Sequence, residues 1–272
     1  MGLPSVATRD ESARYCWQIF NAEKVRKSEL GGTPYRYWSS FAIAYLLGQR
    51  LSGRIDFLDA GGRDGGTLEL LKALALRGTY TLVDLEPKLR SRTVGEFEIE
   101  VVRSPFRDFK PHRKFDAILF QSCLECVESY EDIAWARDCL KPGGFILATI
   151  ACKDTRRLYP GFWEQGGRYL LDERDLAPAF AGIGLRIVWA CPLGGAISRI
   201  CQFLIHTRFS DFVRRVHRAT TAKLFPRIEK IDPLAKLYWL VNSTSARLDR
   251  LVPLWPIGHC VLLESGEKPP RG

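Results

Sequence analysis

Short apolar runs alternate with amphipathic segments through the middle of the chain, and polar or glycine-containing turns separate them. Some runs, such as 117–120 and 145–148, are continuously apolar, which is typical of strands covered by helices on both faces. The predicted strands span residues 55–60, 80–85, 97–102, 115–121, 145–150, 185–191 and 259–263. The helices predicted between them span residues 67–77, 131–140 and 172–181. This alternation favours an α/β fold with a doubly wound, mostly parallel sheet.

The segments outside this series have a different pattern. Helical periodicity predicts helices at 11–30 and 35–51, and it predicts amphipathic helices in the long stretch before the last strand. The chain is therefore predicted to have four parts. These are N-terminal helices (1–54), an α/β core (55–191), a helical insertion (192–257), and the last strand with a polar tail (258–272).

The charge of the chain is concentrated in the insertion. The 272 residues carry a formal net charge of +9, and residues 195–250 hold 11 Lys/Arg against 4 Asp/Glu. Three interpretations stay open: a helical cap with a solvated basic face, a hydrophobic lid that meets anionic lipid or a lipid-linked acceptor, and an RNA-binding face. The insertion is as apolar as it is basic and matches no known RNA-binding module, which argues against a nucleic-acid partner.

Cysteine usage and the absence of targeting patterns indicate a compartment. The eight cysteines lie mostly in apolar runs, as expected for small buried hydrophobes in a reducing environment. Cys123 and Cys126 form one CxxC without a second pair, so no metal site is expected. No apolar run is long enough for a transmembrane helix, and the first residues do not resemble a signal peptide. The expected location is the cytoplasm, with peripheral membrane contact through 195–250 as an open possibility.

A glycine-rich turn follows the first predicted strand of the core. The strand-like run 55–60 has Asp59 near its end. Gly61, Gly62, Gly65 and Gly66 follow, and a helical pattern starts directly after them. The second strand, 80–85, also carries an acid at its end, Asp84. Strand, glycine turn, helix, strand and acid form half of a nucleotide-binding βαβ unit, which predicts an adenosine-bearing cofactor. A nicotinamide dehydrogenase is disfavoured because Gly-x-Gly-x-x-Gly lacks its middle glycine here.

Four stretches then resemble the class I S-adenosylmethionine (SAM)-dependent methyltransferases, especially the broad type-11 group. They are Leu58-Asp59-Ala60-Gly61-Gly62-Arg63-Asp64-Gly65, Val83-Asp84-Leu85-Glu86-Pro87, Phe115-Asp116-Ala117-Ile118-Leu119-Phe120-Gln121-Ser122-Cys123-Leu124-Glu125-Cys126-Val127, and Leu140-Lys141-Pro142-Gly143-Gly144-Phe145. The resemblance covers about residues 55 to 190 and the last strand. It implies a Rossmann-like, seven-stranded sheet with an antiparallel last strand and a helical insertion before it.

The resemblance also implies roles for individual residues. Asp59, Gly61 and Gly65 would form the loop around the methionine portion and ribose of the cofactor. Asp84 would accept hydrogen bonds from both ribose hydroxyls, the alternative being a capping aspartate in a strand–helix turn. Gln121, with Ser122 beside it, would lie near the sulfonium and the acceptor.

The chain departs from the family pattern at two positions. Arg63 stands where the family has its middle glycine, and a side chain at positive φ costs on the order of 1 kcal/mol. Ser104 stands after the third strand, where many relatives carry an acid that binds the adenine amino group. Ser104 or backbone groups would then serve the adenine.

The expected function is transfer of a methyl group from SAM to a small-molecule or lipid/glycan-linked acceptor, which yields S-adenosylhomocysteine (SAH). Two alternatives remain: a non-catalytic relative that binds a partner or membrane through its insertion, and an RNA methyltransferase. None of His112, His206, His217 and His259 is assigned as a general base, and no catalytic residue is named. Glu125 is expected either to cap a helix start or to take part in catalysis.

Overall fold

The structure, a computed structural model, describes residues 34–63, 65–152, 173–206, 244–245, 248–249 and 256–266. The helix predicted at 11–30 and most of the predicted insertion lie outside these residues. The described strands form one eight-stranded sheet in the order β3-β4-β2-β1-β5-β6-β8-β7. Their bounds are β1 (Arg54–Ala60), β2 (Arg77–Asp84), β3 (Arg92–Val94), β4 (Phe97–Arg103), β5 (Phe115–Gln121), β6 (Leu140–Ala151), β7 (Leu185–Leu193) and β8 (Gly258–Ser265).

The topology confirms the predicted fold class. β1 pairs parallel with β2 and β5, β2 with β4, and β5 with β6. β8 runs antiparallel to both β6 and β7, as expected for the last strand. All seven predicted strands are present. The eighth, β3, pairs antiparallel with β4 at the sheet edge, and its three residues are too few to produce a hydrophobic pattern.

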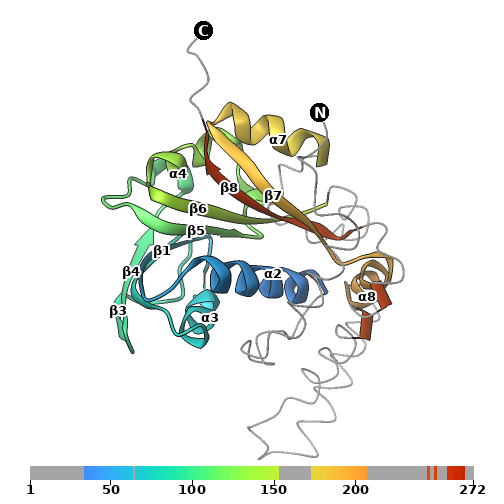
Figure 1. The fold of residues 1–272 in the computed structure, drawn as a ribbon, viewed down its shortest axis with the longest axis horizontal. Helices are drawn as coiled ribbons and strands as arrows, with labels where there is room; N and C mark the ends of the chain where they lie inside the picture. The colour runs from blue at the N-terminus through green and yellow to red at the C-terminus, as the bar shows by residue number, and fades with distance from the viewer. Residues whose placement is uncertain are drawn as a thin grey trace, which may run out of the picture.

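Helices cover both faces of this sheet (Figure 1). The helices α2 (Pro34–Arg50) and α3 (Gly66–Ala73) lie on one face, and α4 (Trp135–Asp138) and α7 (Glu173–Gly182) lie on the other. Successive strand residues alternate between two buried clusters: Phe57 and Leu119 pack with α2 and α3, whereas Leu58 and Ile118 pack on the opposite face. This two-sided burial explains the continuously apolar strands.

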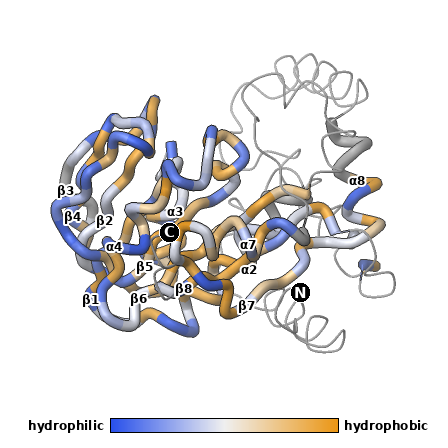
Figure 2. The backbone as a smooth tube through the Cα atoms, turned by 90° about the horizontal axis from the view of Figure 1, so that it is seen from above, coloured by the Kyte–Doolittle hydropathy of each residue, from blue (hydrophilic) through white to orange (hydrophobic). Residues whose placement is uncertain are grey.

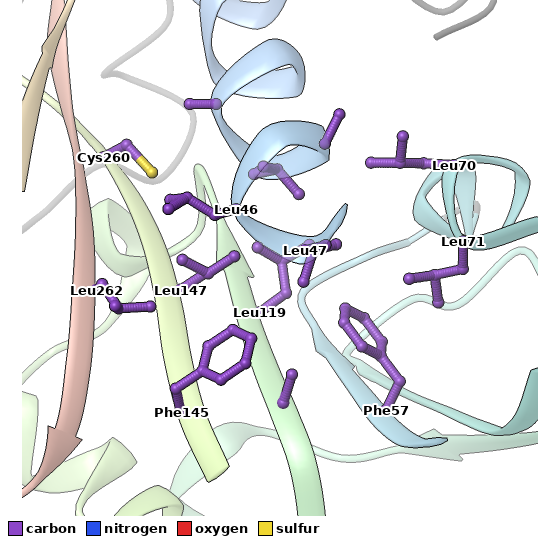
Figure 3. Close-up of a cluster of buried hydrophobic side chains, with 14 of the residues drawn as sticks. Leu46, Leu47, Phe57, Leu70, Leu71, Leu119, Phe145, Leu147, Cys260 and Leu262 are labelled. Atoms are coloured by element: carbon purple, nitrogen blue, oxygen red, sulfur yellow. The ribbon is translucent and has the colours of Figure 1, made fainter. Parts of the chain in front are cut away.

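The cluster below α2 joins distant parts of the chain (Figure 3). Leu46 and Leu47 of α2 point toward Leu119 of β5 and Leu147 of β6, and Leu262 comes in from β8. Hydrophobic residues are concentrated along the central strands and α2, whereas the β3–β4 edge is more hydrophilic (Figure 2). The buried cluster therefore joins α2 to the central strands of the sheet.

Two predicted helices are shorter than the pattern suggested. The helix predicted at 67–77 ends at Ala73, because Ala75 takes a left-handed conformation (φ 57°) and β2 already begins at Arg77. The helix predicted at 131–140 is broken into the 3₁₀ turn η3 (Tyr130–Ile133) and the short α4. β6 begins earlier than predicted, because Leu140 already pairs with Phe115; a register shift follows before Phe145 pairs with Ala117.

The start of the insertion docks on α2 through α8 (Ala196–His206). The indole N–H of Trp38 donates to the hydroxyl of Ser198 at 3.0 Å, and that hydroxyl lies 3.3 Å from the hydroxyl of Ser245. The Asp249 carboxylate accepts from the N–H groups of Ile197 (2.9 Å) and Ser198 (3.1 Å) in the first turn of α8. Burial raises the pKa of Asp249, and hydrogen bonds from Ser198 and its neighbours work against that rise. Ser245 and Asp249 of the insertion thus contact its first residues, Ile197 and Ser198, beside α2.

Candidate functional site

The loop after β1 has the backbone that its glycines predict. The three positions at which the family carries glycine all have positive φ: 78° at Gly61, 36° at Arg63 and 72° at Gly65. A Cβ at Gly61 would lie 2.7 Å from Cβ of Cys123, and a Cβ at Gly65 would lie 2.8 Å from a methyl group of Leu89. Gly61 is therefore required on both conformational and steric grounds, and Gly65 chiefly because of its positive φ, since the Leu89 methyl group can move.

Asp59 lies beneath this loop. Its side chain is fully buried, and its carboxylate accepts a hydrogen bond from the hydroxyl of Tyr80 on β2. A Cβ on Gly62 would overlap the Asp59 carboxyl group, so the loop backbone rests directly on it. Phe57 stacks on the Tyr80 ring with 6.0 Å between centroids. Asp59 is thus placed to support the loop from below, and no sequence pattern pointed to Tyr80 as its partner.

Asp84 joins the loop to the end of β2. One of its carboxylate oxygens accepts from the N–H of Glu86 at 2.7 Å, and the other accepts from the N–H of Arg63 at 3.2 Å. The capping interaction is therefore present. A carboxylate has about four acceptor positions, so two backbone bonds leave capacity for further donors. The next side chain, Leu85, is 62% exposed, so an apolar surface lies directly beside the carboxylate.

Ser104 lies next to Asp84 across the β2–β4 pair. Its N–H donates to the carbonyl of Asp84 at 3.1 Å, and its hydroxyl donates to the carbonyl of Pro105 at 3.0 Å. Arg103 precedes it, and its Nε donates to the carbonyl of Leu85 at 3.0 Å. The structure therefore brings Asp84, Leu85 and Ser104 together, as the sequence predicted for Asp84 and Ser104 but not for Leu85.

Gln121 and Ser122 lie at the end of β5. The side-chain amide of Gln121 lies 3.5 Å from the hydroxyl of Ser39 on α2, at the limit of a hydrogen bond. Ser122 has a φ of 54°, and its N–H donates to both the carbonyl and the hydroxyl of Thr149, each at 3.2 Å. The ends of β1, β2, β4 and β5 share one edge because these strands are parallel, so all the predicted site residues lie along that edge.

Glu125 lies in the 3₁₀ turn η2 (Leu124–Cys126), and its side chain is buried. Its Oε1 accepts from the N–H of Ala151 at 2.7 Å. The pairing of β5 with β6 ends at Thr149, so β5 does not pair with Ala151. Glu125 thus binds the last backbone N–H of β6; it does not cap a helix. Burial raises the pKa of its carboxyl group from 4.5 to about 7, and the Ala151 hydrogen bond opposes that rise.

The histidines are far less informative. His112 is exposed beside Arg113 and Glu100, so it belongs to a solvated cluster. His259 is buried in β8, and its Nε2 lies 3.3 Å from the thiol of Cys152. The side chains of His206 and His217 lie outside the described residues. Within the described chain, no three Asp, Glu, His or Cys side chains are grouped to hold a metal ion, and none of the helices is long and apolar enough to cross a membrane.

Comparisons with known proteins bear on the fold. Many solved structures match the chain, among them the following three. Coclaurine N-methyltransferase, bound to N-methylheliamine and SAH, is 15% identical with a TM-score of 0.51, covering 97% of this chain and 84% of that one. Mycolic acid cyclopropane synthase CmaA1, complexed with SAH and CTAB, is 12% identical with a TM-score of 0.52 and 82% coverage of each chain. A putative methyltransferase bound to the Haloferax volcanii Trm112 activator is 12% identical with a TM-score of 0.51, covering 93% and 98%.

At the sequence level, no curated protein matches the chain significantly. A family model described as a methyltransferase domain matches residues 36–189, which is more than half of the chain. The matched residues include the glycine loop, the end of β2 and the end of β5. The resemblance to class I SAM-dependent methyltransferases is confirmed, and the chain belongs to the methyltransferase-domain family.

Proposed function

We propose that this protein is a SAM-dependent methyltransferase that releases SAH and acts on a small-molecule or lipid/glycan-linked acceptor. The observation that carries the proposal is the meeting of the glycine loop with Asp84 and Leu85 at the carboxyl edge of the sheet. Asp84 offers the charged acceptor that a ribose diol needs, and Leu85 offers an apolar face for a purine. The residues present therefore fit an adenosine-bearing cofactor.

Each residue has a defined part in this proposal. Asp84 would bind the ribose hydroxyls, the loop from Gly61 to Gly65 would enclose the methionine portion and ribose, and Ser104 would face the adenine. Gln121 would orient the acceptor side. SAM would supply an activated methyl group for in-line displacement, so alignment by these residues provides much of the rate. A base is needed only for a hydroxyl or a protonated amine.

The acceptor is proposed from the insertion. Residues 195–250 are basic, and the two exposed large apolar side chains described there are Ile200 (56% exposed) and Leu248 (42% exposed). Apolar side chains beside basic ones suit a lipid-linked acceptor and peripheral contact with an anionic membrane. Flotation with vesicles of phosphatidylcholine alone or mixed with phosphatidylserine tests this part. Absence of binding to either at low salt would leave only the soluble acceptor.

Cofactor binding is tested by titration with SAM and SAH. Micromolar affinity is expected, and Asp84→Ala should weaken it by one to three orders of magnitude, at roughly 1.4 kcal/mol per tenfold. Because Asp84 also binds the loop backbone, Leu85→Ala is a second variant: its exposed side chain contributes little to stability, and we expect a three- to tenfold loss, on the order of 1 kcal/mol. Glu86→Ala is the matched control, since only its N–H is used.

Two outcomes would refute the proposal. If neither SAM nor SAH binds wild-type protein below millimolar concentration, the protein is a non-catalytic relative that uses the same fold for binding a partner. If both bind but Asp84→Ala and Leu85→Ala leave the affinity unchanged, the cofactor lies elsewhere. Once binding is established, incubation with methyl-labelled SAM and extracts of the native cell identifies the fraction that takes up label.

A further inference from the structure

A cysteine and a histidine meet where β6 ends and β8 begins. The two strands are antiparallel: Ile150 pairs with His259 and Ala151 with Gly258, so Cys152 follows opposite Ile257 and His259 is its diagonal neighbour. The N–H of Cys152 donates to the carbonyl of Ile257 at 3.1 Å, which fixes the backbone at this point. Backbone hydrogen bonds thus position Cys152, directly after β6, and His259, within β8.

The side chains are in hydrogen-bonding contact. Sγ of Cys152 lies 3.3 Å from Nε2 of His259. The imidazole is buried, whereas Cys152 is partly exposed. With Nε2 unprotonated, the thiol donates to it. A thiol beside an imidazole is the arrangement in which the ring accepts the thiol proton and leaves a thiolate nucleophile.

The other described cysteines have different surroundings. Cys126 is an exposed residue. Desolvation of its sulfur and the nearby charges of Glu125 and Asp84 raise the pKa of its thiol. Burial raises the pKa of Cys260 to about 12. Cys123, Cys139 and Cys191 are buried, and Cys201 is partly exposed, but burial and the charge of Asp249 raise the pKa of its thiol. Cys152 is partly exposed and has the His259 ring beside it as a proton acceptor.

We propose that Cys152 and His259 form a nucleophilic thiol–imidazole pair, a covalent modification site for soft carbon electrophiles. The proposal does not depend on the proposed methyltransferase activity. Nε2 of His259 takes the thiol proton, and the sulfur forms a bond to the electrophilic carbon. With an α-haloamide, the halide leaves with the electrons of the broken carbon–halogen bond. With an α,β-unsaturated carbonyl, the electrons of the C=C bond move to the α-carbon, which then receives the proton.

The position gives such an adduct a consequence. β6 lies beside β5, and Ser122 at the end of β5 binds Thr149 of β6, three residues before Cys152. An adduct on Cys152 therefore forms on the same edge of the sheet as Gln121, two strands away from the glycine loop on β1. This last step alone rests on the proposed function: the adduct would lie on the acceptor side of the edge and leave the adenosine side untouched.

Competitive labelling of the full-length protein with iodoacetamide tests the pair. Peptide mass spectrometry gives the labelling rate of each cysteine at neutral pH. We expect Cys152 to react about tenfold faster than Cys126 in native protein, and at the same rate in concentrated urea, where the pair is lost. His259→Gln should slow Cys152 about tenfold and leave the rate of Cys126 within about twofold. Buried Cys260 reports folding, because it stays unlabelled only in a folded variant.

The result that overturns the proposal needs no variant. If native wild-type Cys152 reacts no faster than Cys126, or keeps its advantage in urea, the imidazole does not activate it. If His259→Gln folds, with Cys260 protected, and Cys152 reacts at the wild-type rate, the proposal also fails. If the variant unfolds, the ratio between native and urea-treated wild-type protein decides. An SAH titration of the alkylated protein should give unchanged affinity, and a large loss would contradict the placement on the acceptor side.

Discussion

Tyr80→Phe removes one oxygen atom from beneath the glycine loop. The Tyr80 hydroxyl donates to the buried Asp59 carboxylate, and the ring stacks on Phe57, so the substitution deletes a hydrogen bond and keeps the stacking. A hydrogen bond to a charged group contributes about 1.5–3 kcal/mol, and no cavity larger than a hydroxyl group is formed. We therefore expect the free energy of unfolding to fall by about 2 kcal/mol, which lowers Tm by roughly 4–8 °C for a chain of this size.

The substitution should also affect ligand binding. The carboxylate of Asp59 lies directly under Gly62, so losing one of its donors loosens the loop from below. We expect a less than tenfold loss of SAH affinity, smaller than that of Asp84→Ala, because Tyr80 is buried and touches no ligand. Urea unfolding and isothermal titration measure the two effects on the same preparation.

A double-mutant cycle separates the bond from its surroundings. The coupling energy between Tyr80→Phe and Asp59→Asn should be about 1–3 kcal/mol, as for residues in direct contact. Tyr130→Phe is the control: Tyr130 is also buried and also packs on a phenylalanine, but on the opposite face of the sheet, so SAH affinity should not change. A coupling energy below about 0.5 kcal/mol would refute the claim that this hydrogen bond supports the loop.

Two further predictions concern charges away from the loop. Burial raises the pKa of Glu125 to about 7 in the folded protein, above the value of 4.5 expected in the unfolded chain. Its contribution to the free energy of unfolding is therefore present below pH 4.5 and is lost as the pH rises toward 7. Glu125→Gln should therefore gain up to roughly 3 kcal/mol over wild type between pH 5 and pH 8 in urea unfolding, and a pH-independent difference would contradict this. Lys141 binds Asp56 at 2.7 Å and Asp116 at 2.8 Å. Lys141→Met should therefore lower the free energy of unfolding by about 1 kcal/mol after allowance for solvent screening. Lys72→Met breaks only an i,i+3 pair and should lower it by less than about 0.5 kcal/mol. Equal costs for the two lysine variants would show that the shared contacts of Lys141 add nothing.

The sequence predicted the ends of some strands and helices closely and those of others poorly. β1, β4 and β5 begin and end within one residue of the prediction, and so do α2 and α7, whereas β2 begins three residues and β6 five residues before the predicted start. Helix ends depend on single backbone conformations. The left-handed Ala75 ends α3 early, and its side chain gives no sign of this, because alanine is a good helix former.

The candidate site divides in the same way. Asp84, Ser104 and Gln121 lie at the carboxyl edge because each follows a parallel strand, which a sequence pattern reveals. Tyr80 and Leu85 could not be found, since a tyrosine within a strand is normally core and a leucine at its end is normally buried. Their importance comes from contacts across strands: Tyr80 lies 21 residues from Asp59, and only the register of β1 with β2 brings the two together.

Arg63 shows how the loop keeps its form without the glycine that the family has there. A non-glycine residue at positive φ costs on the order of 1 kcal/mol. Two backbone hydrogen bonds offset that cost, because the N–H of Arg63 donates to Asp84 and its carbonyl accepts from the N–H of Lys88 at 2.7 Å. Neither bond depends on the side chain, so the backbone path is set by Asp84 and Lys88. Asp84 therefore both shapes the loop and is the proposed ribose ligand. A variant such as Leu85→Ala leaves both backbone hydrogen bonds of Arg63 intact, so it can separate cofactor recognition from loop folding.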